Sequence, residues 1–224
     1  MADIVISAKG IHKTYGKRST SYEALRGIDF DVEKGESVAI IGKSGSGKST
    51  LMHLLALLDK STKGVIKING TDATKLKSRQ LNKIRCLKFG FVFQQFFMNP
   101  RDSVLNNVML PLKIAGVRKS QRKRRAMKAL KIVELDDKAK NKANDLSGGQ
   151  KQRVCIARAL VNSPSVIFAD EPTGNLDSAT GKKIEDLLIK LNEAGITLIV
   201  VTHDEDLARR CSRQIHIKDG RIEK

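Results

Sequence analysis

The stretch from Gly42 to Thr50 reads GKSGSGKST, and its residue types and spacing are those of a loop that binds phosphate. Its glycines let the backbone turn so that N–H groups point at an anion, and a following helix adds the positive end of its dipole. Lys48 would reach the β- and γ-phosphates, and the hydroxyl of Ser49 would coordinate Mg²⁺. We therefore predict that a nucleoside triphosphate is bound by Gly42, Lys43, Ser44, Gly45, Ser46, Gly47, Lys48, Ser49 and Thr50.

The residues on either side of this loop have the patterns of a strand and a helix. An apolar run at 36–41 (ESVAII) precedes the loop, and a second run at 51–55 (LMHLL) follows it. Chance alone would produce the loop pattern in roughly one chain in a hundred of this length at average residue frequencies. The flanking strand and helix make chance a poorer explanation, because the motif requires that context.

Two acidic residues follow another apolar run. Asp170 and Glu171 come directly after residues 166–169 (VIFA), which have the composition of a buried parallel strand. Ligands of parallel sheets lie at the carboxyl ends of the strands. Asp170 would therefore hold Mg²⁺, directly or through water, and Glu171 would polarise a water for attack on the γ-phosphate. The alternative is a strand-end carboxylate that caps a turn before Pro172.

Gln94 and His203 occupy equivalent positions, after the apolar runs at 90–93 and 198–201. The amide oxygen of Gln94 could contact Mg²⁺ or the attacking water, and His203 could hydrogen-bond a γ-phosphate. Each has an ordinary structural alternative, because a lone histidine at a strand end is more often a satisfied structural residue.

The sequence LSGGQ at 146–150 precedes a helical pattern over 151–160. Ser147 is well placed as an N-cap, and Gly148 and Gly149 allow the backbone to approach an anion closely. One phosphate loop does not need a second phosphate-binding helix terminus in the same chain. We therefore expect this one to serve a nucleotide held by another copy or a homologous subunit, the alternative being an ordinary helix start.

The remaining pattern predicts an α/β fold. Residues 100–159 have mainly helical periodicity, whereas the N-terminal segment is rich in strand patterns around a turn at 16–21. This order predicts a parallel α/β core, a small antiparallel sheet at the N-terminal side, and a helical lobe inserted between roughly residues 96 and 160. Further strands are expected at 64–70, closed by an Asn-Gly turn, at 165–169, at 197–201, and in a hairpin around Asp-Gly at 214–222.

Composition bounds the class of protein. A chain of 224 residues, of which 40% are hydrophobic, is expected to form one soluble globular domain. No apolar run approaches the length of a membrane span, and the N-terminal residues lack the basic start and long apolar core of a signal peptide. The three cysteines lack metal-ligand spacing, and their odd number argues against a disulfide framework, which favours a reducing cytosol.

The net charge of +18 is partly concentrated at 113–131, where no acidic residue occurs. Helical spacing places Ala126, Met127, Leu130 and Val133 on one side and leaves the basic side chains to solvent. Three interpretations stay open: a solvated helix face, contact with anionic lipid headgroups, and nucleic-acid binding. The absence of tryptophan and of aromatic residues interleaved with the basic ones weakens the nucleic-acid interpretation.

Taken in order, these motifs resemble the nucleotide-binding subunit of an ATP-binding-cassette (ABC) transporter over essentially the whole chain, and LSGGQ is diagnostic of that family. The resemblance implies a P-loop NTPase fold with ABC-ATPase architecture in a single domain over 1–224. Such a domain has a RecA-like parallel-sheet core, an N-terminal antiparallel β subdomain and an inserted helical subdomain. The matching elements are Tyr15 as the aromatic that stacks on adenine, 42–50 as Walker A, Gln94 as the Q-loop, 146–150 as the signature, 166–171 as Walker B with the catalytic Glu171, 174–177 as the D-loop and His203 as the switch histidine.

The resemblance also implies a mechanism. Two cassettes would close head to tail over two ATP molecules, each bound by the Walker A loop of one chain and by Ser147 and Gly149 of the other. Lys43 departs from many relatives, which have a small residue or proline there, and we expect it to face solvent. The implied catalytic residues are Lys48, Gln94, Glu171 and His203, and the implied Mg²⁺ ligands are Ser49, Gln94 and Asp170.

The implied partners are an integral membrane permease subunit, which would contact residues 94–100, and a second ATP-binding subunit, expected to give a homodimer when ATP is bound. No nucleic acid is expected. The implied location is peripheral, at the cytoplasmic face of the plasma (inner) membrane. In finer detail, 23–27, 90–96 and 169–177 resemble ATPases of the macrolide-export, lipoprotein-release and cell-division branch, which power export, lipoprotein release or mechanotransmission.

Other classes of ABC protein fit less well. Repair and chromosome-organising ATPases generally carry long coiled-coil insertions, and translation factors usually carry two cassettes and a linker, none of which occurs here. A module that clamps on ATP with little turnover is opposed by the intact Glu171 and His203. Specificity in this family lies mainly in the membrane subunit, so the sequence leaves open the substrate, the direction of transport and whether the partner cassette is identical.

Overall fold

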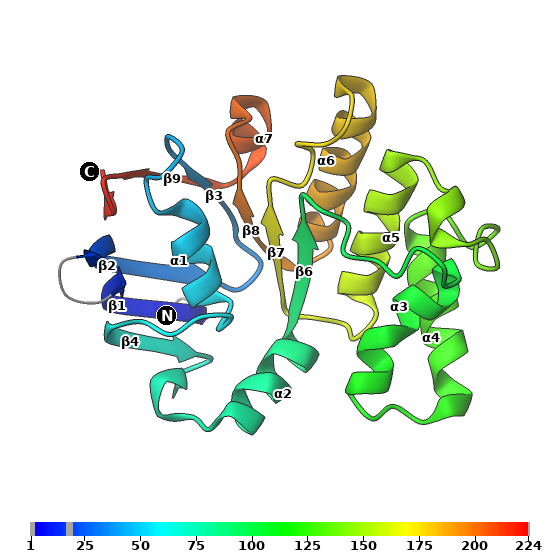
Figure 1. Ribbon diagram of the computed structural model, residues 1–224, viewed down its shortest axis with the longest axis horizontal. Coiled ribbons are helices and arrows are strands. Elements are labelled where there is room, and N and C mark those ends of the chain that lie inside the picture. Colours follow the sequence, from blue (N-terminus) through cyan, green and yellow to red (C-terminus); the bar gives the residue numbers. More distant parts are fainter. Residues whose placement is uncertain (1–2, 17–19, 224) are drawn as a thin grey trace. The chain divides into compact units, whose positions relative to one another are not determined.

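The computed structural model describes residues 3–16 and 20–223 and divides into two compact units (Figure 1). The first unit comprises Met1–Asn82 together with Gly195–Lys224, and the second comprises Lys83–Ala194. The second unit is therefore an insertion in the sequence of the first. The predicted helical lobe at 96–160 lies within the range of the second unit.

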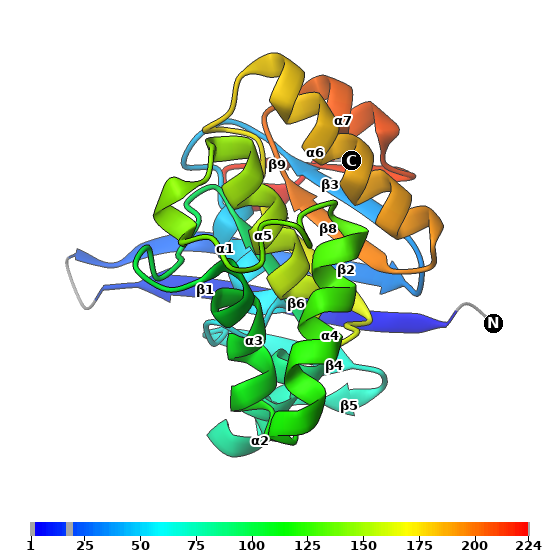
Figure 2. The same cartoon turned by 90° about the vertical axis from the view of Figure 1, so that its right-hand side faces the viewer.

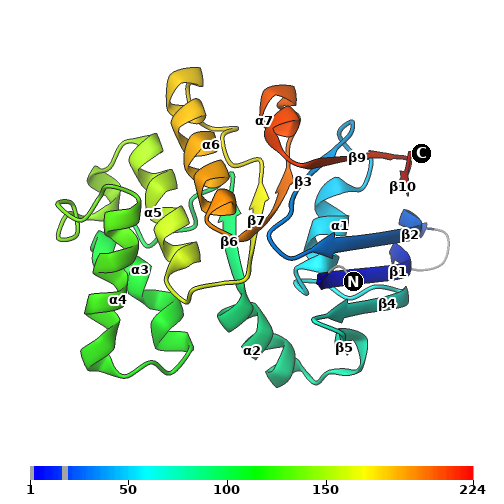
Figure 3. The ribbon, with the colours of Figure 1, turned by 180° about the vertical axis from the view of Figure 1, so that it is seen from behind.

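The N-terminal part of the first unit is an antiparallel sheet with the strand order β2-β1-β4-β5, seen from behind in Figure 3. Along β2, Ile28, Phe30 and Val32 are buried whereas Asp29 and Glu33 are exposed. This period-two alternation is what a strand with one covered face requires. The strands are β1 (Ile4–Tyr15), β2 (Tyr22–Glu33), β4 (Lys63–Ile68) and β5 (Thr71–Asp72).

Two predicted turns are confirmed. Asn69 and Gly70 link β4 to β5 with φ values of 47° and 76°, and Asp219 and Gly220 give φ values of 48° and 75° in the C-terminal hairpin. Positive φ at both central residues is the geometry of a tight hairpin turn, which Asn, Asp and Gly tolerate best. The predicted turn at 16–21 has its centre, residues 17–19, outside the described part of the chain.

Strand β3 (Ser37–Ile41) lies between two parallel neighbours, β8 (Thr197–Val201) and β9 (Arg213–Lys218), and β9 pairs with β10 (Arg221–Ile222) in the confirmed C-terminal hairpin. Every residue of β8 is buried, as expected for a strand covered on both faces. The pairing of Ile40 with Val201 shows that β3 and β8 end at the same edge. The predicted strands at 36–41 and 197–201 are confirmed.

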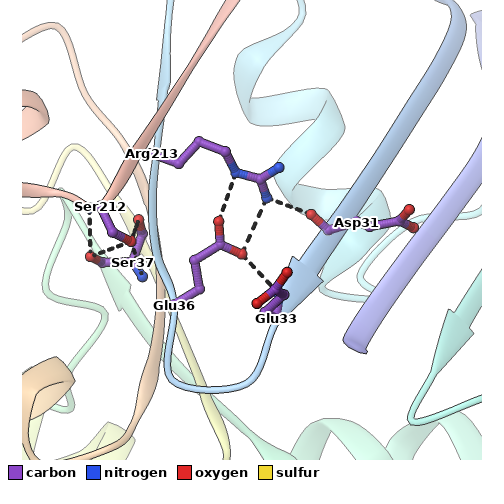
Figure 4. Close-up of polar contacts among 6 residues, drawn as sticks. All are labelled: Asp31, Glu33, Glu36, Ser37, Ser212 and Arg213. Carbon is purple, nitrogen blue, oxygen red and sulfur yellow. Dashed lines mark hydrogen bonds and ion pairs between the residues drawn. The ribbon is translucent and has the colours of Figure 1, made fainter. Parts of the chain in front are cut away.

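An ion pair anchors the start of β3 to β9 (Figure 4). The Nε atom of Arg213 lies 2.7 Å from Oε1 of Glu36, and Arg213 also donates to the carbonyl oxygen of Asp31 in β2. The backbone N–H of Ser212 donates to Oγ of Ser37 at 2.9 Å, and the Ser212 hydroxyl donates to the Ser37 carbonyl at 2.8 Å. These contacts fix the register of β3 and hence the point at which the phosphate loop leaves the strand.

Helix α1 (Lys48–Leu55) follows the loop and confirms the helix predicted at 51–55. It buries Leu51, Met52 and Leu54 against the rest of the first unit. Other helical segments of the first unit are η2 (Ala73–Lys75), α7 (Glu205–Arg210) and the beginning of α2 (Ser78–Lys88), which contains the division between the units.

The second unit contains the parallel strands β6 (Phe89–Phe93) and β7 (Val166–Asp170), confirming the strands predicted at 90–93 and 165–169. The ring of Phe89 meets that of Phe168 edge-on with 5.1 Å between centroids, and Phe91 stacks on Phe168 at 5.8 Å. Such aromatic pairs stabilise a core beyond the apolar area that they bury.

Helices α3 (Val104–Ile114), α4 (Lys119–Ile132) and α5 (Gly148–Leu160) lie side by side in the second unit (Figure 2), which confirms the helical periodicity predicted over 100–159. On α4 the buried side includes Ala129, whereas Met127, expected there, is half-buried. No helix among the described residues is long and apolar enough to cross a membrane. The unit also contains η3 (Ala143–Asp145) and α6 (Ser178–Glu193).

Candidate functional site

The backbone of the phosphate loop requires glycine for two separate reasons. Gly42, Gly45 and Gly47 have φ values of 153°, 77° and 109°, which L side chains rarely adopt. A Cβ atom on Gly42 would also lie 2.2 Å from the carbonyl oxygen of Ile217, and one on Gly47 would lie 2.8 Å from that of Ala24. The loop can therefore take this path only with glycine at both of these positions.

The side chain of Lys48 turns back toward the loop that precedes it. Its Nζ donates to the carbonyl oxygens of Gly42 at 2.8 Å and of Lys43 at 3.0 Å. An ammonium group has three N–H donors, so these bonds hold the cation beside the loop and leave capacity for an anion. The buried Oγ of Ser46 has no hydrogen-bond partner within the described chain, which fits a loop that binds a further polar group. The exposed loop residues are Lys43, as expected, with Ser44, Gly45 and Ser49.

Tyr15, at the end of β1, is held by its hydroxyl. The hydroxyl donates to Oδ2 of Asp59 at 3.0 Å, and Nζ of Lys13 lies 2.8 Å from the same oxygen and 4.6 Å from the centre of the Tyr15 ring. Burial, followed by the bond to Asp59, raises the pKa of Tyr15, whose hydroxyl also bonds with the side chain of Thr50 in the phosphate loop. Tyr15 is nevertheless 41% exposed, so its ring keeps surface on which a base could stack.

A second aromatic residue, Tyr22, was not singled out from the sequence. It lies directly opposite Tyr15 across the β1–β2 ladder, and its hydroxyl is 3.4 Å from the carbonyl oxygen of Gly45. The register of the β1–β2 hairpin could have indicated Tyr22, because residues that face each other across paired strands are neighbours.

His203 follows β8 at the same edge at which the phosphate loop follows β3. The backbone N–H of Thr202 donates to the carbonyl oxygen of Ile40 at 3.3 Å, which continues this alignment beyond the strand. The Asp204 carboxylate caps α7 by accepting from the backbone of Asp206 at 2.8 Å. His203 is exposed between these two anchored residues. The first unit therefore places His203 at the sheet edge from which the loop leaves, and joins Tyr15 to Thr50 of the loop.

In the second unit, Gln94 and Asn175 make two hydrogen bonds with each other. Nε2 of Gln94 donates to Oδ1 of Asn175 at 3.2 Å, and Nδ2 of Asn175 donates to the Gln94 carbonyl at 2.9 Å. A Cβ atom on Gly174 would lie 2.8 Å from Nε2 of Gln94. Because Gly174 has no side chain, the segment 174–177, which resembles a D-loop, can lie close to Gln94.

Asp170 ends β7 opposite Phe93 of β6, so Asp170 and Gln94 lie at neighbouring strand ends. Glu171 follows with a φ of 46°, a left-handed conformation that is uncommon for a residue with a side chain and often marks a functional position. Buried Gln152 donates from Nε2 to the carbonyl oxygens of Pro172 at 2.6 Å and Phe93 at 3.2 Å. These two hydrogen bonds were not predicted from the sequence, because no local pattern around a glutamine within a helix indicates such long-range contacts.

The predicted N-cap at Ser147 is confirmed, and it forms a full capping box with Gln150. The Ser147 hydroxyl accepts from the Gln150 backbone at 3.3 Å, and the Gln150 side chain accepts from the Ser147 backbone at 3.0 Å. A Cβ atom on Gly149 would lie 2.2 Å from Cγ2 of Thr180, and one on Gly148 would lie 3.3 Å from Cδ2 of Leu176. Gly149 is thus packed against Thr180 in the first turn of α6, and Gly148 against Leu176 just before that helix.

The proposed Mg²⁺ ligands are of suitable chemistry. A hydroxyl from Ser49, an amide oxygen from Gln94 and a carboxylate from Asp170 are the oxygen donors that this hard cation prefers. Across the described part of the chain, no group of three or more His, Cys, Asp or Glu side chains could hold a metal by itself.

Comparison with known proteins decides the family. The family model described as ABC transporter matches residues 25–174. The chain belongs to the ABC transporter family. It is an ATP-binding and ATP-hydrolysing cassette of that family, with the α/β fold and motif order that the sequence predicted.

The ABC cassette has relatives of high identity. It is 49% identical to an uncharacterised ABC transporter ATP-binding protein of Thermotoga maritima (98% of this chain, 94% of the relative) and 46% identical to the lipoprotein-releasing system ATP-binding protein LolD of Syntrophus aciditrophicus (97% and 98%). The macrolide export ATP-binding/permease protein MacB of Bdellovibrio bacteriovorus is 47% identical over 98% of this chain, which spans 33% of MacB.

A similar solved structure is the ATP-binding cassette MJ0796, a dimer in a post-hydrolysis state bound to ADP and Pi. The two chains share 46% identity with a TM-score of 0.89, over 98% of this cassette and 97% of that chain. A relative of that name comes from Methanocaldococcus jannaschii.

Proposed function

We propose that this cassette hydrolyses Mg-ATP with the residues that its motifs assign, as one of a pair of cassettes that drive a membrane permease. The observation that carries the proposal is the presence of two anion-binding elements in one chain. The phosphate loop has Lys48 beside it, and the capped helix start at Ser147 lies elsewhere in the sequence. In a pair of chains, the phosphate loop of one chain and the helix start of the other would bind the same nucleotide.

The first unit would bind the nucleotide itself. The loop amides and Lys48 would neutralise charge on the β- and γ-phosphates, because N–H groups and an ammonium converge there. The exposed ring of Tyr15 would stack on adenine, and His203 would hydrogen-bond the γ-phosphate. Lys43 would remain in solvent.

The residues after β6 and β7 would direct hydrolysis. Bound Mg²⁺ would neutralise charge on the phosphates, with Ser49, Gln94 and Asp170 as its protein ligands. Glu171 would accept a proton from the attacking water or orient it. The Gln94 side chain bonds to Asn175 through Nε2, and its Oε1 is the atom that would bind the metal.

The second cassette is proposed to be another copy of this chain. Ser147 and Gly149 would contact the nucleotide of the partner, where the helix dipole and backbone N–H groups favour an anion. The dimeric relative bound to ADP and Pi supports this arrangement.

A separate membrane subunit is proposed as the partner, and the cassette would sit peripherally at the cytoplasmic face of the membrane. The name of MacB joins an ATP-binding part and a permease in one chain, and this cassette spans a third of that length. LolD, in contrast, is named as an ATP-binding protein and matches over its length. Export, lipoprotein release or force transmission is the class of work that these relatives support, with residues 94–100 as the permease contact.

The test is to recover the Glu171→Gln protein from native membranes in Mg-ATP and to identify the chains that copurify. Replacing the carboxylate with an amide should slow hydrolysis by about 10²–10⁴-fold, and the closed pair should persist. A polytopic membrane protein in stoichiometric amount is the expected result. Unchanged turnover would remove Glu171 from the mechanism, and recovery of nucleic acid without a membrane protein would refute the transporter role.

A further inference from the structure

The helical hairpin formed by α3, the turn after it and α4, here called the α3–α4 hairpin (residues 104–132), carries a block of basic residues from Lys113 to Lys131. No acidic residue occurs between Asp102 and Glu134. None of the motif residues discussed above lies in this segment, so the proposed ATPase mechanism leaves its charge unexplained.

The charges of α4 lie on its solvent side. Ala126, Ala129 and Leu130 are buried, whereas Arg124, Lys128 and Lys131 are exposed at the i, i+4 and i+7 spacing of one helix face. Those three side chains make no ion pair within the described residues. Unpaired charges on a rigid helix are a fixed source of positive potential.

Three aliphatic side chains of the same hairpin are also exposed. Ile114, at the end of α3, is 70% exposed, Leu110 one turn earlier is 49% exposed, and Ile132 at the end of α4 is 45% exposed. Ile132 lies one turn beyond Lys128 on the solvent side of α4. Cationic residues combined with exposed aliphatic ones suit the boundary between lipid headgroups and acyl chains.

We propose that the α3–α4 hairpin binds anionic phospholipid headgroups, with the exposed aliphatic side chains inserted at the headgroup boundary. The proposal deepens the proposed function, since it assigns a bilayer contact to a cassette that works beside a permease. Nucleic acid is a poorer occupant, because residues 103–133 contain no aromatic side chain on which a base could stack. Clusters of basic residues on an amphipathic helix are a recurring means of binding anionic lipid.

The experiment is sedimentation of the purified chain with vesicles of phosphatidylcholine alone or mixed with phosphatidylglycerol, at physiological ionic strength. The test variant is Arg124→Gln/Lys128→Gln/Lys131→Gln. The matched control, Lys67→Gln/Lys77→Gln/Arg79→Gln, removes the same charge from exposed positions of the first unit. Each basic residue at an anionic surface contributes about fivefold to binding, so the test variant should bind about 100-fold more weakly and the control much less so.

Binding should require phosphatidylglycerol and weaken with added salt. Ile114→Ser should bind several-fold more weakly without a change of charge, which separates insertion from simple attraction. Equal losses in the test and control variants would show that net charge alone acts and would overturn the proposal. Tighter binding to a fluorescent RNA than to these vesicles would also overturn it. ATPase activity of the test variant should be unchanged, so failure of the lipid proposal is distinguishable from failure of the proposed function.

Discussion

The hydroxyl of Tyr15 donates to the carboxylate of Asp59 at 3.0 Å, and this bond ties the end of β1 to the segment after α1, the helix that begins in the phosphate loop. Lys13 reinforces the tie, since its Nζ lies 2.8 Å from the same carboxylate and donates to the Lys60 carbonyl at 2.8 Å. The proposed adenine-binding ring is therefore positioned by contacts with Asp59 and Lys13 outside the phosphate loop, in addition to its bond with Thr50.

Asp59→Asn should weaken ATP binding without weakening triphosphate binding. The amide removes the negative charge that pairs with Lys13 and weakens the bond from the Tyr15 hydroxyl, so the ring is held less firmly. An aromatic stacking contact is worth about 0.5–1.5 kcal/mol, so ATP affinity should fall by about 2–12-fold. Titration calorimetry with ATP and with inorganic triphosphate measures both affinities. Asp72→Asn, which removes the half-buried carboxylate 3.6 Å from the exposed Lys75, is the control.

Two results would contradict this role for Asp59. One is an unchanged ATP affinity, and the other is an equal loss of triphosphate affinity. Ultraviolet titration adds a second measurement, because the bond to Asp59 helps to raise the pKa of Tyr15. In the variant the pKa of Tyr15 should move toward its ordinary value.

Lys48→Ala should reduce Mg-ATP affinity by about 10–100-fold, because a hydrogen bond to a charged group contributes about 1.5–3 kcal/mol. Lys43→Ala is a demanding control, since it removes the neighbouring but exposed cation of the same loop. Fluorescence titration with a labelled ATP analogue compares the two. Normal affinity in Lys48→Ala, or an equal defect in Lys43→Ala, would contradict the assignment.

Gly149→Ala should abolish most ATP turnover, either through a clash with Thr180 or through loss of direct contact with nucleotide. A second substitution distinguishes these two causes. The new Cβ would lie 2.2 Å from Cγ2 of Thr180, so the Thr180 side chain or the start of α6 must shift. Thr180→Ser removes that methyl group. If the clash is the cause, Gly149→Ala/Thr180→Ser should regain at least several-fold in steady-state turnover over Gly149→Ala. No recovery would instead favour direct contact of Gly149 with nucleotide, with Thr180→Ser alone as the control.

Native Cys155 should resist alkylation. Burial raises its pKa to about 11, and its thiol donates to the Phe96 carbonyl at 3.0 Å. Because thiolate is the reactive form, the reactive fraction at pH 8 should be about 100-fold below that of a thiol with the ordinary pKa of 9.0. Reactivity should rise as pH approaches 11. The alkylation rate is measured by iodoacetamide labelling and peptide mass analysis, with urea-unfolded protein as the reference. Fast labelling of native Cys155 at pH 8 would be inconsistent with a buried thiol.

Much of this site was accessible from sequence because its chemistry is local. The phosphate loop, the Ser147 N-cap and the acidic residues after β7 each depend on a few adjacent residues. Other contacts depend on tertiary structure or strand register, which no short pattern encodes. They are the pairing of Gln94 with Asn175, the hydrogen bonds from Gln152, and the position of Tyr22 opposite Tyr15. Ala129 lies on the buried side of α4 in place of Met127, because positions 126, 129, 130 and 133 follow the i, i+3, i+4, i+7 spacing of one helix face.

The C-terminal hairpin shapes the outside of the phosphate loop. Gly42 has no room for a Cβ atom because of Ile217, and the backbone N–H of Gly220 donates to the Ser46 carbonyl at 3.0 Å. The reciprocal pair of Ser37 and Ser212, at the starts of β3 and β9, joins positions 175 residues apart. During synthesis the loop therefore emerges long before the strand that gives it its final path. Nucleotide cannot stabilise the nascent chain early, because binding stabilises only a state in which the site exists. The loop reaches its final conformation only after the later segments have been translated.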